Sequence, residues 1–254
     1  MPAKSKPTRQ PYEIEDMRAR QHDAYAHAKY ELLLSWLGAA ADTPRNILNV
    51  GCGSGELCIL LAQRGHTVLG IDPAVEYVSL ASARAEQQNL SNCHFEISDL
   101  RGVNKGQPHR QYDVVFSTDV VEHIADDVEA IGQLTALVRP GGDLFLTVPG
   151  GQYLFGYHDE QLGHYRRYSL RQLADRLPLN LEIKKLRYFG FSLIPVAWLY
   201  SRALRSYYPV SKTGNKKTNP VLTHTVRFVL SLEQKIRPPL GTSCLLWAKK
   251  STND

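Results

Sequence analysis

The chain has 254 residues, of which 43% are hydrophobic, and a formal net charge of +5. This length and composition suffice for one large domain with its own core, and they exclude a chain that is disordered throughout. The longest apolar segment, residues 189–208, is interrupted by Pro195, Arg202 and Arg205, so we expect no membrane-spanning helix.

Residues 1–11 are basic and lack the apolar stretch of a secretion signal, so we expect a flexible tail. The four cysteines, Cys52, Cys58, Cys93 and Cys244, show neither C-x-x-C spacing nor a nearby set of histidines, which argues against structural zinc. Reduced thiols are typical of a cytoplasmic protein, and we expect that location.

Short apolar runs and helical patterns alternate along the chain. We expect strands at 46–50, 67–71, 93–97, 112–117, 143–148, 181–189 and 243–250. We expect helices at 12–37, 56–65, 74–89, 127–138 and 169–177, the last opened by a capping box of Ser169 and Gln172, and a loop at 99–111. Mostly apolar strands that alternate with helices predict an α/β fold, with a parallel sheet covered on both faces.

About 50 residues, 192–241, separate the last two predicted strands, far more than a hairpin requires. They contain two amphipathic helical patterns, roughly 193–207 and 220–236. In the second pattern, the apolar residues that share a face are Leu222, Val226, Val229 and Ile236. We therefore expect a single domain over 12–254 with a helical insertion before its last strand.

The insertion holds eight Lys or Arg residues and a single acid, Glu233, so the basic charge of the chain is concentrated there. One interpretation is a lid over the active site whose charges face water. A second is a basic amphipathic surface that contacts an anionic membrane or a lipid-linked substrate. Nucleic acid is the least favoured partner, because no extended basic surface with aromatic stacking residues is evident.

Glycines cluster directly after the first predicted strand, in NVGCGSGE. Gly51, Gly53 and Gly55 would let a ligand approach the backbone at the start of the next helix, where free N–H groups favour an anion. Asp72 ends the second strand, where an acid can accept both hydroxyls of a ribose, and Asp99 follows the third. Each feature alone is equally typical of a tight turn or a helix cap.

Five motifs in order resemble those of class I S-adenosylmethionine-dependent methyltransferases, over about residues 45–150: ILNVGCGSGE, GIDP, ISDL, YDVVFSTDVVEHI and LVRPGGDLFLTVP. The resemblance implies a Rossmann-like seven-stranded sheet in the order 3-2-1-4-5-7-6 and S-adenosylmethionine as cofactor. It also implies a cofactor-binding set: Asn49, Gly51, Gly53, Gly55, Asp72, Pro73, Asp99, Leu100, Ser117 and Thr118. Asn49 departs from the family, which usually carries an acid there, so cofactor affinity is the property that this residue affects.

A nicotinamide-dependent dehydrogenase is the nearest alternative for a glycine-rich loop. Its fingerprint is G-x-G-x-x-G. Here Gly51, Gly53 and Gly55 give G-x-G-x-G, and position 56 is Glu56. This mismatch argues against a dehydrogenase.

The segment 149–169 after the fifth strand holds the candidate acceptor site. We expect His158 or His164 to act as general base, and Arg166 and Arg167 to bind an anionic or polyhydroxylated acceptor. Other expected acceptor contacts are Tyr153, Tyr157, Asp159 and Tyr165. The alternative is a solvated loop with a basic and aromatic surface.

Asp119, Glu122 and His123 form an acid-and-histidine cluster in DVVEHI that is compatible with a divalent metal. The simpler interpretation is that Glu122 and His123 begin a helix and line the cofactor cleft. We expect no metal.

The sequence therefore predicts a methyltransferase of a small-molecule acceptor. A hydroxyl of a sugar, quinone, phenol or lipid-linked metabolite is favoured, because the acceptor segment supplies candidate bases. Two alternatives are N-methylation of a small amine or peptide, and a non-catalytic cofactor-binding scaffold.

Overall fold

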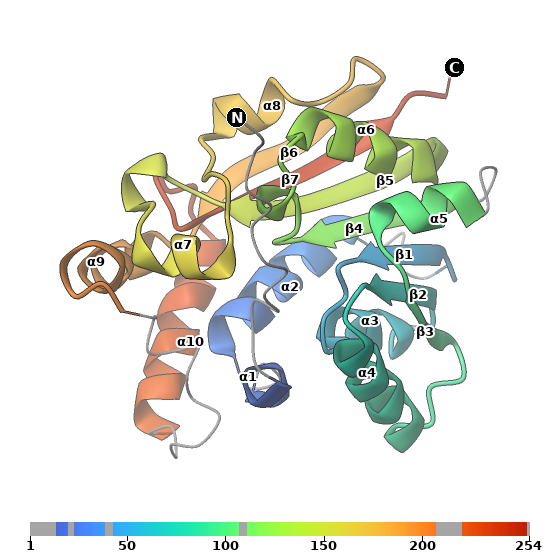
Figure 1. The fold of residues 1–254 in the computed structure, drawn as a ribbon, viewed down its shortest axis with the longest axis horizontal. Coiled ribbons are helices and arrows are strands. Elements are labelled where there is room, and N and C mark those ends of the chain that lie inside the picture. Colours follow the sequence, from blue (N-terminus) through green and yellow to red (C-terminus); the bar gives the residue numbers. More distant parts are fainter. Residues whose placement is uncertain (1–13, 20–22, 39–42, 107–110, 207–219, 253–254) are drawn as a thin grey trace, which may run out of the picture.

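The computed structural model describes residues 14–19, 23–38, 43–106, 111–206 and 220–252. At its centre lies a seven-stranded sheet in the order β3-β2-β1-β4-β5-β7-β6, which confirms the predicted order (Figure 1). The strands are β1 (Asn46–Val50), β2 (Thr67–Asp72), β3 (Cys93–Ile97), β4 (Tyr112–Thr118), β5 (Val138–Pro149), β6 (Leu181–Phe189) and β7 (Ser243–Lys250). β7 pairs antiparallel with β5 and β6, and the other pairs are parallel.

Helices cover both faces of the sheet. One face packs against α2 (Ala24–Leu37), α3 (Glu56–Ala62), α4 (Val75–Gln87) and α10 (Pro220–Gln234). The opposite face packs against α5 (Leu100–Gly106), α6 (Asp127–Leu137) and α8 (Leu170–Ala174). The α/β architecture predicted from alternating strands and helices is therefore confirmed.

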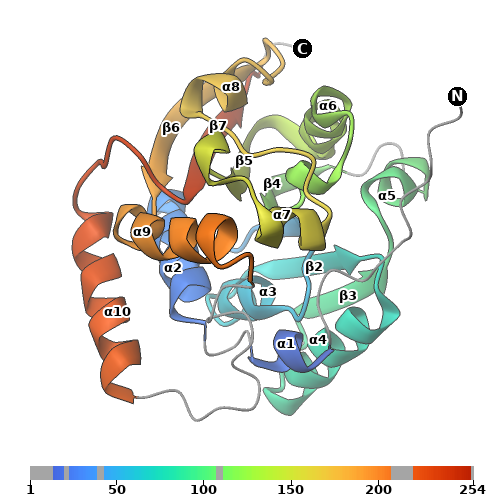
Figure 2. The same ribbon diagram turned by 60° about the vertical axis from the view of Figure 1, so that its left-hand side comes forward.

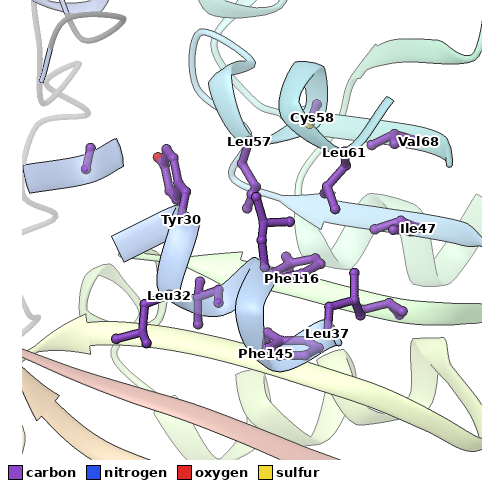
Figure 3. Packing of buried hydrophobic residues seen from close by; sticks show 14 of the residues in the cluster. Tyr30, Leu32, Leu37, Ile47, Leu57, Cys58, Leu61, Val68, Phe116 and Phe145 are labelled. Carbon is purple, nitrogen blue, oxygen red and sulfur yellow. The ribbon is translucent and has the colours of Figure 1, made fainter. Parts of the chain in front are cut away.

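Two hydrophobic clusters hold these layers together, one on each side of the sheet. Because successive strand residues point to opposite faces, Ile47 joins the first cluster and Leu48 the second. Phe116 and Phe145, from adjacent strands, stack in the first cluster with ring centroids 4.7 Å apart (Figure 3). Each fully buried side chain of this kind stabilises the fold by about 1.5–3 kcal/mol.

Tyr25 of α2 ties the N-terminal helix to the last strand. Its hydroxyl lies 2.7 Å from Thr242 Oγ1 and donates to Ser243 Oγ at 2.8 Å. Its ring stacks on Phe189 of β6, with centroids 5.6 Å apart. Elements more than 200 positions apart in sequence thus form one packed unit.

The predicted helix over 12–37 is wrong in one respect: the structure has two helices, α1 (Ile14–Ala19) and α2. The Asp23 carboxylate accepts from the backbone N–H groups of Tyr25 and Ala26, so it starts α2 afresh. The predicted loop at 99–111 contains α5, and the segment 149–169 contains a short helix, α7 (Tyr157–Leu162).

The insertion between β6 and β7 is helical, as predicted. It begins with η5 (Phe191–Leu193) and α9 (Ile194–Trp198), continues as a π-helical turn, η6 (Leu199–Ala203), and ends with α10. Pro195 lies in the first turn of α9, where its missing N–H costs no helical hydrogen bond. No helix among the described residues is long and apolar enough to cross a membrane. The predicted tail, 1–11, lies outside the described residues.

Candidate active site

The glycine loop follows β1 and leads into α3. Gly51 N and Cys52 N both donate to Ile71 O, at 2.8 and 2.9 Å, which fixes the turn against β2. Gly51 has a φ of +71°, and a Cβ there would lie 2.2 Å from Val120 Cγ2. Gly53 has a φ of +53°, and a Cβ there would lie 2.7 Å from Met17 Cε. Gly51 therefore excludes a side chain by conformation and by space, whereas Gly53 does so by conformation, because the flexible end of Met17 can move.

Asp72 at the end of β2 is buried and faces this loop. Its Oδ2 accepts from Gly53 N and its Oδ1 from Ala74 N, each at 3.0 Å. The carboxylate thus orders the loop and places a negative charge beside it. Pro73, the next residue, is exposed.

The remaining predicted cofactor residues lie along the same carboxyl edge of the sheet. Asn49 donates to Cys58 Sγ at 3.4 Å, and Ser117 is fully buried at the end of β4, next to Thr118. Asn49 Oδ1 and Ser117 Oγ are buried, and neither has a hydrogen-bond partner in the part of the chain that the structure describes. Polar atoms in this state suit a polar ligand lying across the edge.

Asp99 and Leu100 have different surroundings. Asp99 is exposed, and its Oδ1 accepts from Gly102 N at 2.7 Å in the first turn of α5. Leu100 is buried in the second hydrophobic cluster. Asp99 therefore has the capping role that the sequence left open. Its predicted contact with the cofactor stays a prediction.

Helix α1 closes one side of the glycine loop, which the sequence did not predict in detail. Met17 is 1% exposed. Ser54 Oγ donates to Met17 O at 3.0 Å, and Arg84 Nη2 donates to Arg18 O at 3.1 Å. Arg84 also pairs with Glu56 at 2.5 Å. The α1 helix is thus held over the site by backbone acceptors that no side-chain motif reveals.

A second unpredicted residue is Lys29 of α2, whose side chain reaches Asp119 just after β4. It is 4% exposed and forms an ion pair with Asp119, whose φ is +57°. Thr147 Oγ1 donates to the same carboxylate at 3.0 Å. A lysine among the apolar residues of AYAHAKYELLL is the signal in the sequence that pointed to a buried partner.

The segment after β5 contains α7 (Figure 2) and organises its polar side chains around Asp159. This residue is fully buried. Its Oδ1 lies 2.8 Å from both His164 Nδ1 and Arg167 Nε, and its Oδ2 accepts from Gly156 N at 3.1 Å. Burial opposes ionisation, but His164 and Arg167 together hold the pKa of the Asp159 carboxyl below its usual range. An ionised carboxylate only accepts, so His164 Nδ1 donates in this contact, and in the neutral imidazole Nε2 is then the acceptor.

Several predicted acceptor contacts have partners within the fold, and their contact with an acceptor stays a prediction. Arg167 is buried against Asp159. Arg166 donates to Ile124 O and Ala125 O and pairs with Asp127, so its charge is used within the fold.

The other residues of the segment differ in access and basicity. Tyr153 and Tyr165 are about half exposed, and Tyr157 is half-buried. Burial lowers the pKa of His158 to about 3, which makes His158 a much weaker base than an ordinary histidine. The predicted choice between two bases therefore favours His164.

Glu122 is a second buried acid beside His164, on the side of the ring opposite Asp159. It lies in η3 (Val121–His123), is 1% exposed, and its Oε1 is 4.0 Å from His164 Nε2. Neither carboxylate oxygen has a hydrogen-bond partner among the residues that the structure describes. Burial, reinforced by Asp119, raises the pKa of the Glu122 carboxyl well above its usual range.

The acid-and-histidine cluster differs in membership from the predicted one. Glu122, His123 and His164 offer ligand atoms within 4.8 Å of one another, whereas Asp119 pairs with Lys29. The rings of His123 and His164 meet edge to face, with centroids 4.6 Å apart. This group could hold a metal ion; that none is required stays a prediction.

Comparisons with known proteins agree with this geometry. A family model described as a methyltransferase domain matches residues 19–182, so the chain belongs to the methyltransferase domain family. A ubiquinone biosynthesis O-methyltransferase from Coxiella burnetii is 31% identical over 132 residues, 45% of this chain and 55% of the relative. The chain thus matches about half the length of the curated relatives.

Solved structures share the fold. Magnesium protoporphyrin IX methyltransferase from Synechocystis PCC 6803, solved with bound SAM, has a TM-score of 0.52 and 20% identity and covers 89% of this chain and 80% of its own. Coclaurine N-methyltransferase bound to N-methylheliamine and SAH has a TM-score of 0.59 and 15% identity, with coverage of 88% and 72%. At these identities the likeness concerns the fold.

Proposed function

We propose that this chain is an S-adenosylmethionine-dependent methyltransferase that acts on a hydroxyl group of a small molecule. The observation that carries the proposal is the glycine loop at Gly51 and Gly53, held by Asp72 at the carboxyl edge of the sheet. In open α/β sheets this edge is where ligands bind. The methyltransferase family match over residues 19–182 supports it.

The residues that would hold the cofactor come from adjacent strand ends. Asp72 would accept hydrogen bonds from ribose hydroxyls, and the loop between Gly51 and Gly55 would lie against the remainder of the cofactor. Asn49 and Ser117 would supply hydrogen bonds at the end of β1 and β4. S-adenosylmethionine supplies a methyl group on a sulfonium, which a nucleophile attacks in line.

The acceptor would be a hydroxyl whose proton His164 Nε2 removes. Asp159 holds His164 Nδ1 at 2.8 Å, so the ring is fixed in orientation and tautomer. General-base catalysis of this kind contributes typically ~10²–10⁴-fold. The curated relatives are named ubiquinone biosynthesis O-methyltransferases, which favours a phenolic hydroxyl over a sugar.

We also propose that the protein works in the cytoplasm and takes no nucleic acid as partner. The four cysteines are free and buried, which suits a reducing compartment. The basic residues of the insertion have their own explanation below.

Calorimetry with S-adenosylhomocysteine tests cofactor binding, and a radiolabelled methyl assay with phenols tests transfer. Asp72→Asn removes a charged acceptor, and hydrogen bonds to charged groups contribute about 1.5–3 kcal/mol, so binding weakens roughly 10–100-fold. Asp175→Asn, at an exposed ion pair, is the matched control.

Absence of heat with wild-type protein would refute the proposed cofactor. Binding without transfer to any hydroxyl would favour amine acceptors or a non-catalytic scaffold.

A further inference from the structure

Helix α10 turns apolar side chains away from the core. Leu230 is 1% exposed and Val226 packs against the first hydrophobic cluster, so these residues mark the inward side. Phe228, Leu232 and Ile236 are 64%, 47% and 57% exposed. Phe228 and Leu232 lie roughly opposite Leu230 at 100° per residue, so α10 is apolar on its outer side as well. Ile236 follows two residues after the end of the helix. The predicted apolar face is correct for Val226 but not for Val229 and Ile236, which are 38% and 57% exposed, and the side chain of Leu222 lies outside the described residues.

The segment η5–α9–η6 adds a second exposed apolar group near the C-terminal end of α10 (Figures 1 and 2). Its exposed members are Phe191, Val196, Trp198, Leu199 and Leu204, between 43% and 55% exposed. Phe191 N donates to Glu233 Oε1 at 2.7 Å, which joins this segment to α10. Clustered exposed apolar side chains of this extent mark interaction sites.

Positive charges surround these apolar side chains. Arg202, Arg205, Arg227, Lys235 and Arg237 are exposed. Glu233, the one acid of residues 192–241, is 4% exposed and accepts from Phe191 N and Ser192 Oγ, so it adds no surface charge.

We propose that these exposed residues of η5, α9, η6 and α10 form a docking surface for an anionic lipid bilayer. Apolar side chains would enter the interface while Lys and Arg meet lipid phosphates, and Trp198 suits the headgroup region. A second copy of this chain fits less well, because a two-fold contact would bring like charges together.

The docking surface adjoins the acceptor segment. Arg202 Nη1 donates to Phe155 O at 2.9 Å, and a Cβ at Gly156 would lie 2.7 Å from Ser201 O. A docked chain therefore holds α7 near the bilayer. On the proposed function, this position favours an acceptor that dissolves in the membrane.

Vesicle flotation with the full chain tests the docking surface directly. We expect binding to phosphatidylcholine vesicles that contain phosphatidylglycerol, weakened by salt, and little binding to phosphatidylcholine alone. Arg227→Ser with Lys235→Ser lowers the partition coefficient about fivefold per cation. Phe228→Ser with Leu232→Ser lowers it about tenfold or more.

Arg171→Ser and Leu179→Ser, at exposed positions in or near α8, are the matched controls and leave binding unchanged. Thermal unfolding of each variant checks that it folds. No binding of wild-type protein, binding indifferent to both double variants, or a dimer that Phe228→Ser dissociates would overturn the docking surface. Vesicle binding needs no cofactor, so a failed calorimetry experiment leaves the docking surface standing. Equally, a failed flotation experiment leaves the proposed methyltransferase function standing.

Discussion

Lys29 of α2 and Asp119 after β4 form an ion pair across 90 positions of the chain, with side chains 5% and 25% exposed. The pair joins the N-terminal helix to the end of a central strand, next to the buried acid Glu122. It therefore links packing on one face of the sheet to the chemistry at its edge.

Lys29→Met leaves the Asp119 carboxylate without its cation in a largely buried place. We expect a loss of about 3 kcal/mol in the free energy of unfolding, since removal of one partner leaves a charge uncompensated. Adding Asp119→Asn should recover much of that loss. Urea denaturation measures both, and Lys184→Met, at the exposed Glu182 pair, should cost less than about 1 kcal/mol. Equal losses at the two lysines would contradict this account.

Gly51→Ala should abolish cofactor binding, because the new Cβ would lie 2.2 Å from Val120 Cγ2. Gly65 is the matched control: its φ is +86°, but a Cβ there meets nothing within 4 Å. Gly65→Ala should cost only about 1 kcal/mol of stability and leave binding intact. Calorimetry with S-adenosylhomocysteine compares the two. Val120→Ala added to Gly51→Ala should restore part of the binding if the clash is the cause.

Asp159→Asn removes the carboxylate that orients His164 and pairs with Arg167. We expect turnover to fall about a hundredfold in this variant and by a similar factor in His164→Ala. Because the two residues act as a unit, the variant with both changes should lose little more. Initial rates of methyl transfer measure this. His158→Ala and the exposed Glu160→Gln should keep most activity, and cofactor affinity should stay unchanged throughout. Additive losses in the double variant would argue against a dyad.

Glu122 predicts an unusual pH dependence of stability. Its pKa is raised by burial, so its contribution is complete below the unfolded pKa of about 4.3 and declines as pH rises towards the folded pKa. Glu122→Gln mimics the neutral acid and should therefore gain stability over wild type as pH rises from 5 to 8. Urea denaturation across this range measures the difference, with Glu160→Gln as a flat control. If the free energy of unfolding of wild type instead exceeded that of Glu122→Gln by more as pH rises, Glu122 would be ionised and its charge compensated.

Removal of metal ions tests whether the group of Glu122, His123 and His164 holds a metal ion or works without one. We expect this group to work without a metal ion, so EDTA should leave turnover unchanged. If EDTA lowers the activity and a divalent cation restores it, a metal ion lies there instead. The Glu122→Gln variant should then show no such loss with EDTA. The methyl-transfer assay is the measurement.

The sequence predicted the sheet well because the central strands are apolar runs bounded by glycine or polar residues, as in Asn46–Val50 before Gly51. The order of strands came from the motifs, and the structure has that order. The glycine loop and Asp72 lie together because adjacent parallel strands end at one edge.

The acceptor side could not be predicted in the same way. Arg166, Arg167 and Asp159 have the composition of a binding loop, but their partners are set by tertiary folding of α7 against η3. Lys29 comes from a helix far away in sequence, and its pairing with Asp119 depends on where α2 crosses the sheet. Spacing along the chain carries none of this information.

The hydrogen bonds from Tyr25 to Thr242 and Ser243 have a consequence for synthesis. During translation, α2 leaves the ribosome long before β7 exists, so the Tyr25 hydroxyl lacks these two partners until Ser243 has emerged. Nascent chains that stop short of β7 should stay sensitive to protease at α2, and completion of β7 should confer resistance.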